Sequence, residues 1–164
     1  MYKLTKDNNI LIFKYKFLHR NIITNRNLNL WDRTNNVDLC RSDRCSFCEL
    51  FEETLEHLFF DCEITNNFWD RTFQWIGECT NVRLCFSKPE ILLGGAPKEL
   101  DIFNLIFMIG LKYIYYSKIT DQKPIINLFK YILTQHYNAE KLIAQENNKL
   151  ELFNNKWDLI DTCF

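Results

Sequence analysis

The sequence lacks the local signatures of the common catalytic sites. It has no glycine-rich phosphate loop, because the run from Gly94 to Pro97 is not followed by Lys-Ser or Lys-Thr. It has no Gly-x-Ser-x-Gly elbow for a nucleophilic serine. Nowhere do two aspartates stand side by side, as a two-metal polymerase site commonly requires. We therefore expect a chain that is not an enzyme by itself and that has no small-molecule substrate.

The sequence also lacks a long uninterrupted hydrophobic run. Lysines are scattered through the apolar residues of 1–17, so a secretory leader is not expected. Asn104, Gly110 and Lys112 interrupt the apolar stretch 102–116, which is shorter than the ~20 residues of a membrane span. The seven cysteines are an odd number and point to a reducing compartment. We expect an intracellular protein, nuclear or cytoplasmic, with no membrane partner.

Helical periodicity predicts a mainly α fold. Ile10, Phe13, Phe17 and Leu18 can share one helical face. Further helices are expected over 99–117 and 124–147, with Gly77 as a stop between them and the preceding helical segment. The predicted fold is a small zinc-knuckle-like module of three cysteines and one histidine between helices, followed by a helical hairpin. Its expected parts are a basic helical lead-in (1–39), the module (40–77), an irregular linker (78–98) and a C-terminal helical region (99–164).

The module rests on the spacing Cys45-x2-Cys48-x8-His57-x4-Cys62. Three thiolates and one imidazole are ligands that Zn²⁺ prefers, and four of them close a tetrahedral shell. We therefore predict one structural Zn²⁺ per chain and no catalytic metal. The competing interpretation is a set of buried free cysteines with a core histidine.

Two details of the module are open at this point. Cys40 lies five residues before Cys45 and could replace one ligand. A helix is expected to begin near Glu52, Glu53 and Thr54. The two glutamates carry negative charge, which suits the positive N-terminal end of a helix. Cys62 follows His57 by five residues and does not quite share its helical face, so the helix is expected to end or bend there.

Charge is unevenly distributed along the chain. Residues 1–44 carry nine Lys/Arg against four Asp/Glu, whereas residues 45–107 carry four against eleven. The basic segment could face phosphate, with a merely solvated surface as the alternative. The candidate nucleic-acid contacts are Lys14, Lys16, Arg20, Arg26, Arg41 and Arg44. Phe59, Phe60, Phe68 and Trp69 could stack on unpaired bases, but aromatics at helical spacing beside a small metal site more often form its core.

The cysteine segment resembles a known family. Cys45-Ser-Phe-Cys48, then Glu53-Thr-Leu-Glu-His-Leu-Phe-Phe-Asp-Cys62 and Phe68-Trp69, are similar to the zinc-binding segment of non-LTR retrotransposon reverse transcriptases. The similarity is strong over 45–69 and weaker elsewhere. It implies an accessory region, without the polymerase or endonuclease parts, that helps to bind RNA or target DNA during target-primed reverse transcription.

Two functions follow as hypotheses. The first is an accessory piece of a reverse transcriptase, a fragment or decayed copy, that binds RNA or single-stranded DNA. The second is a zinc-stabilised helical module that binds protein, including the polymerase domain of its parent. The acidic balance of 45–107 favours the second more than the resemblance alone would.

Overall fold

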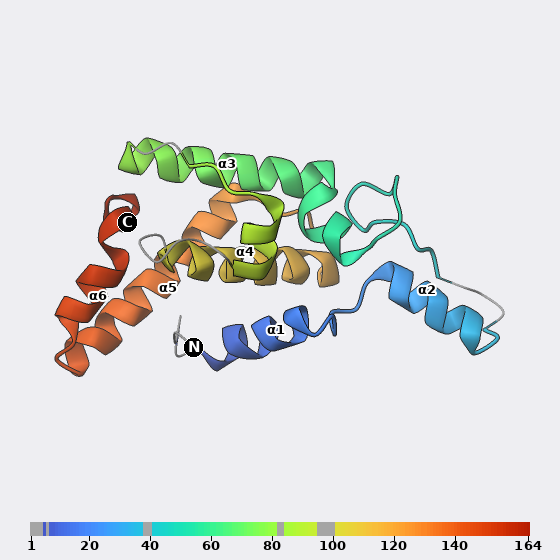
Figure 1. The fold of residues 1–164 in the computed structure, drawn as a ribbon, viewed down its shortest axis with the longest axis horizontal. Coiled ribbons are helices and arrows are strands. Elements are labelled where there is room, and N and C mark those ends of the chain that lie inside the picture. The colour runs from blue at the N-terminus through green and yellow to red at the C-terminus, as the bar shows by residue number, and fades with distance from the viewer. Residues whose placement is uncertain (1–4, 6, 38–40, 82–83, 95–100) are drawn as a thin grey trace. The chain divides into compact units, whose positions relative to one another are not determined.

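A computed structural model of the chain describes residues 5, 7–37, 41–81, 84–94 and 101–164 (Figure 1). The fold is mainly helical with a cluster of three cysteines and one histidine between helices, as predicted. Over the described ranges the only β pairing is an isolated bridge between Arg44 and Glu52. The elements are α1 (Asn8–Leu18), α2 (Asn25–Thr34), the π-helix η1 (His57–Asp61), α3 (Glu63–Thr80), the π-helix η2 (Glu90–Gly94), α4 (Asp101–Ile119), α5 (Ile126–Glu146), α6 (Leu150–Trp157) and the 3₁₀-helix η4 (Asp158–Cys163).

The described residues form two compact units. The metal-cluster unit comprises the described residues of 5–67 and 111–124, and the helical unit comprises those of 68–110 and 125–164. The end of α4 thus belongs with the cysteine segment although it lies far along the chain. The division of the chain into four parts stays a prediction. In the ranges described above, no helix is long and apolar enough to span a membrane.

Helix α1 begins where the Asp7 carboxylate accepts a hydrogen bond from the Asn9 backbone N–H at 2.8 Å. Ile10, Phe13 and Phe17 are buried at positions i, i+3 and i+7 of one face. Leu18 does not share this face, contrary to the prediction, and its side chain is 45% exposed. Each residue turns an α-helix by about 100°, which carries Leu18 out of the stripe that ends at Phe17.

Helix α2 buries polar side chains and exposes apolar ones. Thr24 caps its first turn by accepting from the Asn27 backbone N–H at 3.3 Å. The buried residues of the helix are polar, Asn29 and Asp32, and both bind the backbone of Arg41. The apolar side chains Leu30 and Trp31 point to solvent. Because α2 is held to the chain through polar groups, its apolar side chains remain exposed to solvent.

Helix α3 corrects one predicted boundary. Gly77 does not end the helix, which continues to Thr80. The Thr80 hydroxyl donates to the Ile76 carbonyl at 2.9 Å, inside the last turn. The chain leaves the helix at Asn81, whose φ of 56° is the left-handed conformation that asparagine tolerates. The helix therefore ends just before Asn81, which suits the left-handed cap conformation, and not at Gly77.

The core of the helical unit is aromatic. Phe68 and Trp69 are buried, and Phe68 meets Phe129 edge-to-face at 5.1 Å between ring centroids. Trp69 lies so close to Gly110 that a Cβ there would stand 2.5 Å from the indole ring. The core interpretation is therefore correct for Phe68 and Trp69, which are not available to stack on bases.

Helix α5 is a long predicted helix, and α6 after it was not predicted. Phe153 and Trp157 of α6 are buried against Tyr137 of α5, with ring centroids 5.1 Å apart in both pairs. Glu140 joins the same two helices, because it accepts from Lys156 at 2.7 Å and from the Trp157 indole N–H at 2.9 Å. The apolar spacing of Leu150, Phe153 and Trp157 was the available signal for α6.

Candidate metal centre

The first two sulfurs of the cluster come from a short closed loop. The Cys45 backbone N–H donates to the Phe51 carbonyl at 2.8 Å, and the Glu49 N–H donates to the Cys45 carbonyl at 2.9 Å. Glu49 occupies the left-handed region with a φ of 60°, which lets the chain reverse. The Phe47 N–H points at the Cys45 sulfur at 3.4 Å. The turn therefore places the thiols of Cys45 and Cys48 on one side.

The other two ligands flank η1: His57 is its first residue, and Cys62 follows its last residue. Thr54 starts this helical segment, since its hydroxyl accepts from the His57 backbone N–H at 3.0 Å. In an α-helix, Cys62 would lie about 140° around the axis from His57. The wider π-turn closes instead on a bond from the Cys62 N–H to the His57 carbonyl at 2.8 Å, five residues back. Cys62 itself is extended (φ −66°, ψ 132°), so the predicted bend occurs at this residue.

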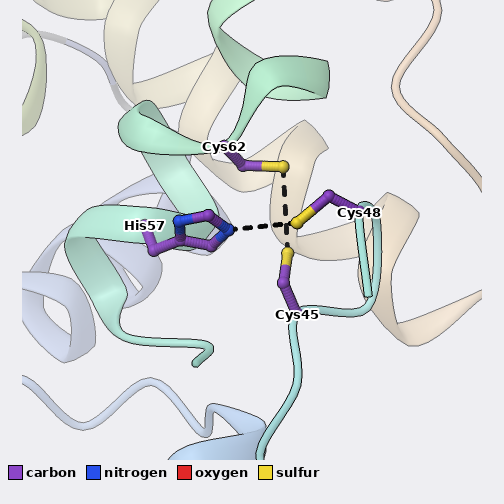
Figure 2. Close-up of side chains that lie close together, drawn as sticks. All are labelled: Cys45, Cys48, His57 and Cys62. Atoms are coloured by element: carbon purple, nitrogen blue, oxygen red, sulfur yellow. Dashed lines mark hydrogen bonds between the residues drawn. The ribbon is translucent and has the colours of Figure 1, made fainter. Parts of the chain in front are cut away.

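The four side chains converge on one point (Figure 2). Their ligand atoms all lie within 4.8 Å of one another. The sulfurs of Cys45 and Cys62 are 3.8 Å apart, and the Cys48 sulfur is 3.3 Å from His57 Nε2. A regular tetrahedron with Zn–S bonds of about 2.3 Å has sulfur–sulfur edges of about 3.8 Å and sulfur–nitrogen edges of roughly 3.6 Å. The donor set and its spacing therefore fit Zn²⁺.

The Cys45 thiol donates a hydrogen bond to the Cys62 sulfur. The hydrogen bond to Cys62 and burial together raise the pKa of Cys45. The same bond lowers the pKa of Cys62 against the effect of burial. Metal ligation requires thiolates, so a divalent cation held by these sulfurs would replace the proton of this hydrogen bond.

Glu53 stabilises the ligand loop, the turn that carries Cys45 and Cys48, by binding Ser46 within it. The sequence alone did not reveal this role. Its carboxylate is fully buried and accepts from the Ser46 N–H and hydroxyl at 2.7 Å each and from the Asn25 N–H at 2.8 Å. Lys118 of α4 pairs with it at 2.8 Å. Burial alone would raise the pKa of Glu53, but the bonds from Lys118 and Ser46 outweigh it and lower that pKa. Glu53 thus accepts a hydrogen bond from the first residue of α2, and it does not cap the helix that follows it in sequence.

The predicted basic contacts divide into two kinds. The four arginines each lie near a carboxylate: Arg20 near Glu56 (2.9 Å), Arg26 near Glu52 (3.3 Å), Arg41 near Asp32 (3.7 Å) and Arg44 near Asp43 (4.0 Å). Lys14 and Lys16 on α1 have no carboxylate partner among the described residues. Arg41 and Arg44 thus lie near carboxylates of the basic segment itself, whereas Arg20 and Arg26 lie near carboxylates from the acidic segment 45–107.

The remaining cysteines lie apart from the cluster. Cys40 is outside the described residues, so its possible ligand role stays a prediction. Cys85 is exposed. Cys163 contacts Cys79 in the helical unit, and burial together with that contact raises the pKa of Cys163 to about 12. None of the three described thiols is among the converging ligands.

Comparison with known proteins agrees with this geometry. Residues 2–69 match the family model described as zinc-binding in reverse transcriptase. The match supports a reverse transcriptase zinc-binding region, which is an accessory region and not the catalytic polymerase domain. Among curated proteins and among solved structures, the comparisons found no significant match. The match ends at Trp69, whereas the unit that holds the cluster also contains 111–124.

Proposed function

We propose that the chain is a zinc-binding accessory region of a non-LTR retrotransposon reverse transcriptase that binds RNA or target DNA during target-primed reverse transcription. The observation that carries the proposal is the convergence of Cys45, Cys48, His57 and Cys62, within a segment that matches the reverse transcriptase zinc-binding family. Convergent thiols alone would support only a metal site. The family match gives that site its biological setting.

In this proposal the four residues hold one Zn²⁺ in a structural role. The ion would supply a rigid four-way link between the Cys45–Cys48 turn and η1. With three sulfurs and one nitrogen in place, the shell is closed and leaves no position for a reacting water. The surrounding residues keep the ligands in position: Glu53 holds the turn through Ser46, and Thr54 holds the start of the helix that carries His57.

Elemental analysis of the purified full chain tests the metal assignment. We expect one zinc per chain, and we expect the Cys62→Ala protein to lose it. The matched control is Cys85→Ala, which removes an exposed thiol outside the cluster and should keep full zinc content. Cys40→Ala tests the open alternative: loss of zinc in that variant would make Cys40 a ligand and one of the four assignments wrong.

The lysines of α1 support the nucleic-acid role, because they have no carboxylate partner among the described residues. The arginines support it less, because each lies near a carboxylate. Arg20 and Arg26 are partly neutralised by Glu56 and Glu52, so they contribute less to phosphate binding than their number suggests. We therefore expect modest, salt-sensitive affinity for single strands. A salt titration of binding to a labelled single-stranded oligonucleotide gives the test, because phosphate contacts lower log affinity linearly with log salt.

The second candidate is a protein-binding module, and α2 is the observation that favours it. Leu30 and Trp31 are 47% and 56% exposed, whereas a helix of a self-contained domain normally buries such side chains. The polymerase domain of the parent protein is the partner in this proposal. An unmodified, zinc-loaded chain that binds no oligonucleotide at low salt would favour this function over the first.

A further inference from the structure

A shallow groove in the metal-cluster unit combines apolar surface with unpaired positive charge. It has a volume of about 310 Å³ and lies where α1, the segment after it and α4 meet. Its lining consists of Asn9, Ile12, Phe13, Lys16, Asn21, Ile22, Ile23, Lys112 and Tyr115. No acidic side chain lines it. Lys112 and Tyr115 lie well beyond the segment that matches the reverse transcriptase family.

The groove has a firm base and an apolar rim. Phe13 and Ile22 are buried beneath it, and Phe13 contacts the Tyr115 ring with centroids 6.0 Å apart. Ile12 and Ile23 are 55% and 53% exposed, so they offer uncovered apolar surface to a ligand. Burial raises the pKa of Tyr115 in spite of a hydrogen bond from the Ile23 backbone, so the phenol is neutral near pH 7.

The charge of the groove differs from that of the rest of the basic segment. Lys16 and Lys112 have no carboxylate partner among the described residues, whereas Arg20, Arg26 and Arg41 each have one. An uncompensated pair of ammonium groups beside apolar surface favours a ligand with both an anionic part and a flat apolar part. The amides of Asn9 and Asn21 add donors and acceptors for a polar edge.

A nucleotide unit of a single strand has this combination of groups. Its phosphates match the ammonium groups, its base face matches Ile12 and Ile23, and its base edge matches the asparagine amides. We propose that the groove between α1 and α4 binds one nucleotide unit of single-stranded RNA or DNA, with Lys16 and Lys112 on adjacent phosphates. This inference rests on the nucleic-acid role proposed above and places it at a site that includes α4.

The test uses the full, zinc-loaded chain and fluorescence anisotropy with a labelled 15-mer of uridine or of thymidine. We expect Lys16→Met and Lys112→Met each to reduce the slope of log affinity against log salt by about 0.7, and the double variant by about 1.4. The matched control is Lys123→Met, which removes the same charge from an exposed position of the same unit and does not line the groove. It should leave the slope unchanged. Equal zinc content and circular dichroism would show that the variants are folded.

A second arm tests the base. Ile12→Asn should weaken binding of the thymidine 15-mer about tenfold, because it removes apolar surface that the base face would cover. It should not change binding of an abasic 15-mer with the same phosphates. Binding by the unmodified chain that is lowered equally by Lys123→Met and Lys16→Met would overturn the groove and leave the nucleic-acid role standing. No binding of either 15-mer at 20 mM salt, roughly the condition in which phosphate contacts are strongest, would overturn the nucleic-acid role itself.

Discussion

Replacing Lys118 with methionine removes the ammonium group that pairs with the buried carboxylate of Glu53. Glu53 is fully buried and the Lys118 side chain is only 9% exposed, so water cannot replace the lost partner easily. Breaking a buried ion pair by removing one partner costs about 3–5 kcal/mol. Glu53 keeps its bonds from Asn25 and Ser46, so we expect the lower end, about 3 kcal/mol of unfolding free energy.

Urea denaturation of the zinc-loaded chain measures this loss, with Lys112→Met as the control on the same helix. The double variant Glu53→Gln with Lys118→Met should recover part of the stability, because the buried charge is then gone. A Lys118→Met protein as stable as the unmodified chain would refute a net contribution of the pair. A double variant no better than Lys118→Met would refute the uncompensated charge as the cause.

Three further predictions concern the two units. A chelator should abolish hydrogen-exchange protection around the ligand loop while α5 and α6 stay protected, and uniform loss over the chain would contradict this. Gly110→Ala should destabilise the chain by about 1–3 kcal/mol in urea, because its Cβ would stand 2.5 Å from Trp69, and an unchanged midpoint would contradict that packing. Burial opposes the ionised form of Glu140, but His136, Lys156 and Trp157 lower its pKa to about 2. Its stabilisation should therefore be complete above about pH 4.5 and fall between pH 4.5 and 2, and Glu140→Gln should remove this pH dependence of unfolding.

The cluster of three cysteines and one histidine could be predicted because its four residues lie close together in the sequence. All four ligands lie within eighteen residues, and their types and spacing define a tetrahedral donor set before any fold is known. The helices α4 and α5 were equally accessible, since Phe103, Phe107 and Leu111, or Phe129 and Leu133, repeat at helical intervals. The π-turn was visible only as a misfit, the five-residue step from His57 to Cys62, which the structure resolves by a wider helical turn.

What the sequence did not reveal depends on pairs that are distant in the chain. The arginines looked like phosphate contacts until their carboxylate neighbours were located, and no sequence pattern links Arg20 to Glu56 or Arg26 to Glu52. Lys112 lies in a predicted C-terminal helix, although the fold places it on the same groove as Lys16. The misplaced stop at Gly77 has a different cause, because Asn81 was an equally acceptable cap a few residues later.

The pairing of Glu53 with Lys118 also sets an order of events during synthesis. Sixty-five residues separate the two partners, so at about 5–20 residues per second the ribosome adds Lys118 some 3–13 seconds after Glu53. All four candidate metal ligands have been added once residue 62 is in place, before the end of α4 exists. A nascent chain therefore carries the full set of candidate ligands while the Glu53 carboxylate still lacks Lys118. Pairing of that carboxylate requires the end of α4, so the packing around the candidate ligands cannot be complete before Lys118 has been added.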